Sequence, residues 1–295
     1  MQFYSHGKIL LSGEYTVLHG AWAIALPTQR GQSLTVHDSN HNTLEWISRN
    51  ADGQTWFEGE FDLDTLNVRS ANNRMVGQRL EHILQNVRQS NPDFCRQGTT
   101  AITELEFDRL WGLGSSSTLL SNLALWAQVD PYHLLNTTLG GSGYDIACAQ
   151  AEGPLFYRKT PTGPEVQALT FDPPFKKDLY FIYLNQKQDS QKEVTQYQKK
   201  TIDISLLEEI SRISQSLVSC KTLEAFQALL ETHEQLMATH LNRPRIQEVL
   251  FSDYTGFVKS LGAWGGDFVL AFGGDNHYFK EKGYRVVEPY TRFIL

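Results

Sequence analysis

The sequence predicts a mixed α+β protein in which strands and helices do not alternate regularly. Three observations support this class. The first hundred residues consist mostly of short apolar or alternating runs, which are typical of strands. A turn rich in glycine and serine at residues 112–118 leads into an apolar run with the character of a helix. The last third carries apolar residues mainly at helical spacing, so no strand–helix unit repeats along the chain.

The elements of the first half follow from local pattern. Strands are expected at Trp22–Leu26, Leu34–His37, Thr43–Ile47, Thr55–Phe61 and Thr99–Phe107. A helix is expected at about Asn73–Gln89, because its apolar residues recur every three or four positions on one face. The turns Gly112–Thr118 and Gly140–Gly143 each precede a helix, and the serines of the first turn are candidate N-caps.

The composition changes at residues 160–175, which hold four of the ten prolines. Such a change favours a boundary between two lobes, and we predict lobes of residues 1–165 and 166–295. Beyond the boundary, strands are expected at Leu179–Leu184 and Phe268–Phe272, and helices at 190–201, 204–219 and 222–241.

Composition and charge restrict the classes of function. The 295 residues carry 26 Lys+Arg and 33 Asp+Glu, a formal net charge of −7, and 41% are hydrophobic. This balance excludes a disordered chain and disfavours a nucleic-acid partner, which would require a basic surface. No apolar run approaches the ~20 residues of a membrane span, and the N-terminus lacks the pattern of a signal peptide. Three distant cysteines indicate reduced thiols, so we expect a cytoplasmic enzyme without a membrane partner.

The segment Gly112–Thr118, GLGSSST, has the composition of a phosphate-binding loop. Glycines allow the backbone to approach an anion, successive N–H groups point at it, and the following helix adds its positive end. A serine hydroxyl in such a loop is a potential Mg²⁺ ligand. The loop is neither a Walker A motif nor a dinucleotide-binding GxGxxG motif, and taken alone a structural turn explains it equally well.

Two further segments change that balance. Residues 7–20 read GKILLSGEYTVLHG, and residues 260–267 read SLGAWGGD. With GLGSSS between them, they resemble in order and spacing the three motifs of the GHMP small-molecule kinases, with mevalonate and phosphomevalonate kinases as the most similar branch. Residues 140–147, GGSGYDIA, strengthen the resemblance, because a Ser-Gly-x-Asp follows the second motif in mevalonate kinases.

The resemblance implies both a fold and an activity. The fold has an N-terminal lobe like domain 2 of ribosomal protein S5 and a ferredoxin-like C-terminal lobe, with ATP in the cleft between them. The activity is ATP- and Mg²⁺-dependent transfer of a phosphoryl group to a hydroxyl of a small metabolite, expected to be mevalonate. Phosphomevalonate is the alternative substrate, and a non-catalytic ligand sensor is the alternative from another class. ATP and a small molecule are the expected partners of a monomer or homodimer.

The resemblance also implies roles for single residues. It makes Asp145 the catalytic base and places Lys8 near that aspartate and the substrate hydroxyl. The residues implied to bind ATP are Gly112, Leu113, Gly114, Ser115, Ser116 and Ser117, with Ser116 as Mg²⁺ ligand and Ser115 as its rival. The implied substrate contacts are Glu14, His19, Ser190, Gly265 and Gly266. For Glu14 and His19 a hydrogen-bonded structural role is favoured, and a helix N-cap explains Ser190 at least equally well.

Three positions depart from the family pattern. Asp108 replaces the proline that usually begins the second motif, and Trp264 replaces a glycine of the third. The Trp264 indole would either narrow the substrate pocket or reshape its loop. Leu134 stands where mevalonate kinases have a Mg²⁺-binding glutamate, and the nearest upstream acid, Asp130, has no assigned role. The metal is then held by serine, phosphates and water, as Mg²⁺ tolerates, or catalysis has been lost.

Overall fold

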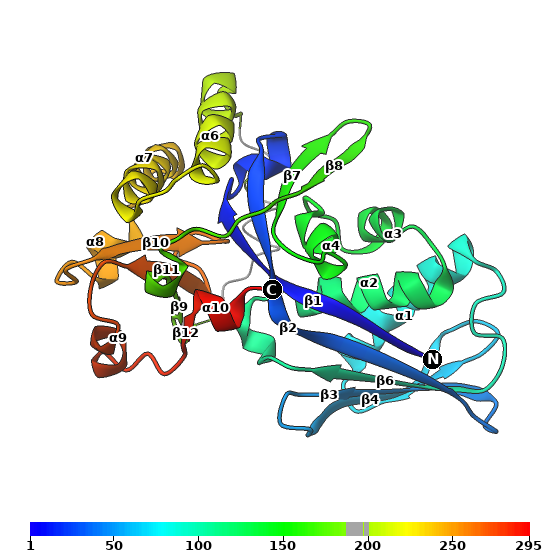
Figure 1. The fold of residues 1–295 in the computed structure, drawn as a ribbon. Helices are drawn as coiled ribbons and strands as arrows, with labels where there is room; N and C mark the ends of the chain where they lie inside the picture. The colour runs from blue at the N-terminus through cyan, green and yellow to red at the C-terminus, as the bar shows by residue number, and fades with distance from the viewer. Residues whose placement is uncertain (187–196, 198–200) are drawn as a thin grey trace. The chain divides into compact units, whose positions relative to one another are not determined.

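The computed structural model describes residues 1–186, 197 and 201–295, which form two sheets flanked by helices (Figure 1). The strands are β1 Gln2–Ser12, β2 Ala23–Asp38, β3 Thr43–Arg49, β4 Thr55–Asp62, β5 Val68–Ala71, β6 Thr99–Leu105, β7 Leu155–Thr160, β8 Gly163–Ala168, β9 Tyr180–Tyr183, β10 Phe257–Leu261, β11 Phe268–Phe272 and β12 Val287–Pro289. The helices are α1 Arg74–Ser90, α2 Ser115–Ala127, α3 Pro131–Thr138, α4 Tyr144–Ala149, α6 Ile204–Leu217, α7 Leu223–Leu241, α8 Ile246–Leu250, α9 His277–Glu281 and α10 Tyr290–Phe293, with 3-10 turns η1 Thr16–His19, η2 Arg109–Trp111 and η3 Lys176–Asp178. The predicted α+β class is confirmed.

The chain packs as two compact units, each assembled from separate segments. The first unit consists of Met1–Gly7, Arg30–Arg109 and Leu113–Gln150. The second consists of Lys8–Gln29, Leu110–Gly112 and Ala151–Leu295. The predicted lobe boundary between residues 165 and 166 stays a prediction; the residues on both sides of it belong to strand β8.

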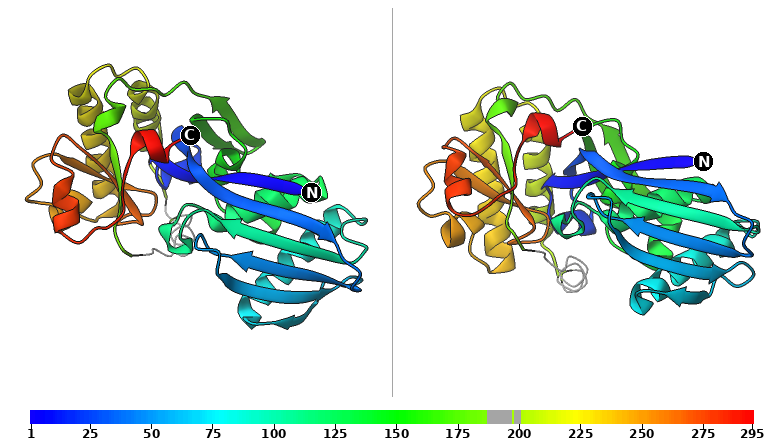
Figure 2. Two further views of the ribbon diagram at one scale, coloured as in Figure 1. Left: turned by 60° about the horizontal axis from the view of Figure 1, so that its bottom comes forward. Right: turned by 90° about the horizontal axis from the view of Figure 1, so that it is seen from below.

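The first unit is a sheet covered by helices. Its strands follow the order β5-β4-β3-β6-β2, and every pair is antiparallel except β3 with β6. Helices α1 and α2 lie on this sheet, α3 packs against α1 and α2, and all three contribute to one hydrophobic core (Figures 1 and 2). Leu80, Ile83, Leu84 and Val87 of α1 are buried, which confirms the face predicted from their spacing.

The second unit contains the smaller sheet, with the antiparallel order β10-β11-β9-β12. Strand β11 is confirmed with the predicted bounds, Phe268–Phe272, and all five residues are buried. Both faces of the strand are therefore covered, which explains why the run is continuously apolar instead of alternating. Helix α7 packs against β10, and α6 packs against α7 (Figure 1).

Several elements differ from the sequence expectations. Strand β2 continues through residues 27–33, so two predicted strands are one, and α2 begins after Gly114 rather than at a capping serine. Strands β1, β5, β7, β8 and β10 and helix α3 were not predicted, because their sequences mix polar and apolar residues or are short. The helix expected at 190–201 falls mainly outside the described residues. Among the described helices, none is long and apolar enough to cross a membrane.

Candidate active site

The glycine loop leads into helix α2 through two glycines in left-handed conformations. Gly112 and Gly114 have φ of +67° and +87°, in the left-handed region that favours glycine. Gly114 caps helix α2, and no described side chain caps the first turn. Its carbonyl accepts the N–H groups of Ser117 and Thr118, both at 2.9 Å. The positive end of α2 is therefore open to an anion.

The three serines of this loop have different environments. Ser116 is exposed and Ser115 is half-buried, whereas Ser117 is buried. Ser117 donates a hydrogen bond from Oγ to Oδ2 of Asp145 at 2.6 Å. The structure thus brings one loop serine onto the predicted base and leaves Ser116 accessible to solvent and to a metal ion.

Asp145 lies in the first turn of helix α4, directly after a second glycine turn. Gly143 has φ +94° and is the N-cap of this helix. The aspartate is half-buried, and its Oδ2 accepts the short bond from Ser117. A charge-assisted bond of this length fixes the orientation of the carboxylate.

In the second unit, Lys8 and Asp267 both lie at Gly112. The Nζ of Lys8, on strand β1, donates to the Gly112 carbonyl at 3.0 Å. The Asp267 carboxylate packs against the α-carbon of Gly112, where a Cβ would lie 1.8 Å from Oδ2. The sequence assigns no role to Asp267 beyond its place at the end of the third motif. In the structure its carboxylate lies directly against Gly112.

The Glu14 carboxylate points into the second unit. Oε1 of Glu14 accepts a hydrogen bond from Lys259 Nζ at 2.5 Å, and Oε2 lies 3.2 Å from Nε2 of His233. Glu234 also approaches Lys259, with Oε1 at 3.6 Å from Nζ. Sequence reasoning missed Lys259, although a lysine inside the apolar run FVKSL was an available signal.

Burial dominates the protonation of this group. It raises the pKa of Glu14, and it raises the pKa of Glu234 to about 7, against the lowering effect of Lys259. Burial and the nearby Lys259 charge hold the pKa of His233 well below its ordinary value. His233 is therefore neutral, in agreement with the hydrogen bond that its Nε2 accepts from the Gly13 N–H at 3.1 Å.

The remaining predicted substrate contacts lie in the second unit. His19 packs against the Tyr197 ring at 5.5 Å, and burial lowers its pKa. Gly265 donates its N–H to Ser260 Oγ at 3.1 Å. Gly266 has no room for a side chain, because a Cβ would lie 2.3 Å from the Ala263 carbonyl. Ser190 lies outside the described residues.

Two of the departures from the family pattern are core residues. The Trp264 indole is 8% exposed, and its N–H donates to the Pro244 carbonyl at 2.9 Å. This favours reshaping of the loop over narrowing of a pocket. Leu134 is fully buried in the core of the first unit, and Asp130 caps α3 by accepting the Tyr132 N–H.

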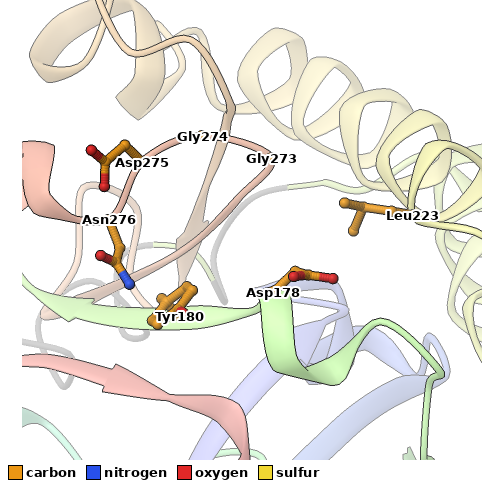
Figure 3. Close-up of a pocket in the computed structure, with 7 residues that line it drawn as sticks. All are labelled: Asp178, Tyr180, Leu223, Gly273, Gly274, Asp275 and Asn276. Carbon is orange, nitrogen blue, oxygen red and sulfur yellow. The ribbon is translucent and has the colours of Figure 1, made fainter.

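A pocket of about 360 Å³ lies elsewhere in the second unit (Figure 3). It is lined by Asp178, Tyr180, Leu223, Gly273, Gly274, Asp275 and Asn276. Residues 273–276 follow β11, whereas Gly265 and Gly266 precede it. The pocket is therefore at the other end of that strand and contains none of the predicted site residues.

Comparisons with known proteins identify the fold. No protein-family model and no curated protein sequence matches the chain. The mevalonate kinase of Methanococcus jannaschii matches with a TM-score of 0.67 at 16% identity, over 97% of this chain and 96% of that one. The phosphomevalonate kinase of Streptococcus pneumoniae, in complex with phosphomevalonate and AMPPNP, matches with 0.67 at 16% identity, over 98% and 99%. The galactokinase of Lactococcus lactis, complexed with galactose, matches with 0.63 at 13% identity, over 97% and 91%. The GHMP kinase fold expected from the sequence is confirmed over nearly the whole chain.

Replacing Gly112 by alanine is expected to destabilise the protein more than the same replacement at Gly140. Both glycines have φ +67°, so each variant carries a left-handed penalty of about 1–2 kcal/mol. Only at Gly112 does the new methyl group meet another side chain, Asp267, whereas nothing lies within 4 Å at Gly140. Urea unfolding should give the lower midpoint for Gly112→Ala. Equal midpoints would contradict the close approach of Asp267.

Replacing Glu234 by glutamine is expected to flatten the pH dependence of stability. The pKa of Glu234 is raised from 4.5 to about 7 in the folded chain, so the folded state binds this proton more tightly than the unfolded state. The stabilising contribution is complete below the unfolded value and is lost as the pH rises through the folded value. The free energy of unfolding of the parent should therefore decrease between about pH 5 and pH 8. In Glu234→Gln this decrease should be smaller, because the glutamine side chain does not titrate.

Urea unfolding across this range measures the effect. Glu224→Gln, an exposed replacement on the same helix, is the matched control and should follow the parent. Parallel curves for the parent and Glu234→Gln would show that this carboxyl is not the group responsible.

Proposed function

We propose that the chain is an ATP- and Mg²⁺-dependent kinase that transfers the γ-phosphoryl group of ATP to a hydroxyl of mevalonate. The observation that carries the proposal is the hydrogen bond between Ser117 and Asp145, which joins the predicted phosphate loop to the predicted base. The fold supports it, since solved structures of small-molecule kinases match over nearly the full length, one of them in complex with AMPPNP.

The loop residues fit the phosphates of a nucleotide. Gly112 and Gly114 both adopt left-handed conformations, and α2 begins without a side-chain cap. We assign phosphate binding to the six residues from Gly112 to Ser117. The side chain of Ser117 is engaged by Asp145 and its N–H by the Gly114 carbonyl, so Ser117 would act on a phosphate through the positive end of α2.

The residues also fit a Mg²⁺ ion that is held largely by its substrate. We assign the protein ligand to Ser116, whose side chain is exposed, with Ser115 beside it. No three His, Cys, Asp or Glu side chains in the described part of the chain cluster so as to hold a metal ion. Mg²⁺ suits such a site because it keeps several waters and binds through phosphates. When bound, the ion would supply positive charge that offsets the negative charge developing on the transferred phosphoryl group.

Asp145 and Lys8 supply the proton transfer and the positive charge. Asp145 accepts the proton of the substrate hydroxyl as the hydroxyl oxygen attacks the γ-phosphorus of ATP. The bond from that phosphorus to the β,γ-bridging oxygen breaks, and ADP leaves. Ser117 holds Oδ2 of Asp145 and leaves Oδ1 for the substrate. The Lys8 ammonium is oriented by the Gly112 carbonyl and stabilises negative charge on the attacking oxygen.

The acceptor is assigned from the motifs. Ser142–Asp145 and His19-Gly20 favour mevalonate, whereas Gly13-Glu14-Tyr15 is nearer to phosphomevalonate kinases, so phosphomevalonate is the alternative. The matching galactokinase is a protein of this fold in complex with a sugar, galactose, so a sugar belongs among the acceptors to be tested. We further propose that the chain acts in the cytoplasm, as a monomer or homodimer. Its three cysteines form no disulfide with one another.

Measurement of ADP release with a panel of acceptors tests the proposal. The panel contains mevalonate, phosphomevalonate, homoserine and galactose, each with MgATP. Turnover is expected with mevalonate, and Asp145→Asn should lower kcat by about 10²–10⁴-fold, the usual contribution of a general base. Binding of ATP without turnover of any acceptor would instead favour the ligand sensor, which the lack of an acidic residue at position 134 motivates.

Replacing Ser117 by alanine is expected to lower kcat and to leave the KM for ATP nearly unchanged. The variant removes the donor that orients Asp145, and bonds to a charged group are worth about 1.5–3 kcal/mol, so kcat should fall about ten- to a hundredfold. Ser90→Ala, an exposed serine at the end of α1, controls for the substitution type. A raised KM for ATP with unchanged kcat would place the Ser117 hydroxyl on the nucleotide instead.

A further inference from the structure

Four ionisable side chains that the proposed chemistry does not use form a buried cluster in the second unit. They are Glu14 in the loop after β1, His233 and Glu234 on α7, and Lys259 on β10. Their side chains are between 0% and 3% exposed. Burial of this many charges is costly, so the cluster needs a physical reason for its presence.

One ammonium group serves two carboxylates. Lys259 Nζ donates to Oε1 of Glu14 at 2.5 Å and to the carbonyl of Ser260 at 2.8 Å, and it lies 3.6 Å from Oε1 of Glu234. Oε2 of Glu14 and Oε1 of Glu234 have no hydrogen-bond partner among the described residues. The cluster is thus short of positive charge, and it depends on Lys259 for what it has.

The cluster is attached to the backbone of two predicted motif loops. In the first loop, the Gly13 N–H donates to His233 Nε2 at 3.1 Å. At the start of the third motif, on strand β10, the Ser260 N–H donates to Oε2 of Glu234 at 3.4 Å, and the Ser260 carbonyl accepts from Lys259. The first motif loop and the strand that leads into the third are therefore both joined to α7, through its neighbouring residues His233 and Glu234.

The first loop contains a strained turn directly beside the cluster. Tyr15 has φ +59° and ψ −46°, and the Thr16 N–H donates to the Glu14 carbonyl at 2.6 Å. This is the rare γ-turn, a conformation that a bulky residue adopts only when its surroundings impose it. The Tyr15 hydroxyl also accepts the Trp264 N–H at 2.8 Å, so the turn is tied to the third loop a second time.

We propose that Glu14, Lys259 and Glu234 are positioning residues that hold the first and third motif loops against α7 and maintain the turn at Tyr15. The role rests on the proposed kinase function, because the two loops continue to Lys8 on one side and Asp267 on the other. The carboxylate of Glu14 acts through Lys259 and the backbone, and not by touching a substrate.

Hydrogen–deuterium exchange of the free protein tests the proposal without any assumption about activity. In Lys259→Met, peptides covering residues 13–20 and 259–267 should exchange at least about tenfold faster, while peptides from strands β3 and β4 are unchanged. Lys282→Met, which breaks an exposed ion pair with Asp253 in the same unit, is the matched control and should leave both loops protected. Unchanged exchange of both loops, or a uniform increase over the whole second unit, would overturn the proposal.

A second variant covers the case in which Lys259→Met does not fold. Glu14→Gln combined with Lys259→Met removes both charges of the ion pair, which avoids an uncompensated buried carboxylate at position 14 and is milder than breaking the pair. The same two loops should become unprotected in the folded double variant, and their continued protection would overturn the proposal.

Kinetics separate this role from the proposed function. With the acceptor that turns over, a positioning role predicts that kcat falls about ten- to a hundredfold in the double variant while the KM for ATP changes little. If the variants exchange faster in both loops but the parent phosphorylates no acceptor, the kinase function is refuted and the positioning role is supported. If the parent is an active kinase and the loops of the variants stay protected, only the positioning role is refuted.

Discussion

The interaction on which the loops of the second unit depend is the contact of the buried Lys259 ammonium with the carboxylates of Glu14 and Glu234. The ammonium group is fully buried between two carboxylates on different elements, and only with this cation in place are those carboxylates tolerable in an apolar interior. Two unusual features lie beside it. The backbone at Tyr15 is strained, and the pKa of His233 is held well below its ordinary value by burial and, second, by the charge of Lys259.

The elements that could be predicted from sequence are those with a strong local pattern. Helix α1 was recognised because apolar residues recur at helical spacing when one face is buried. Strand β11 was recognised because a strand buried on both faces is a continuous apolar run. Strands β7 and β8 were missed because prolines and glycines around residues 160–175 indicate a linker equally well. Strand β2 was divided in two since Pro27 and Gly31 resemble a turn, although Gly31 is needed where the Ser5 carbonyl passes within 2.2 Å of a Cβ position.

The candidate site divides along the same line. The glycine loop could be singled out by its composition, whereas Asp145 was identified by the resemblance of its segment to a family motif. The three loop serines are equivalent in sequence, and only the turn of α2 distinguishes Ser117, which reaches Asp145, from its neighbours. The Glu14–Lys259 pair spans 245 positions, a separation at which no local pattern links two residues. The departures Leu134 and Trp264 look like lost function in the sequence, whereas in the structure both are packed core side chains.

The composition of the second unit from both ends of the chain has a consequence for how the protein folds. The Thr28 strand residue forms a bridge with Ile294, and the Leu295 N–H donates to the Pro27 carbonyl at 3.0 Å. Residues 8–29 therefore complete their packing only with residues 151–295, which lie far away in the sequence. Contacts at such large sequence separation form slowly, so this unit should fold later than parts of the chain that are held by local contacts.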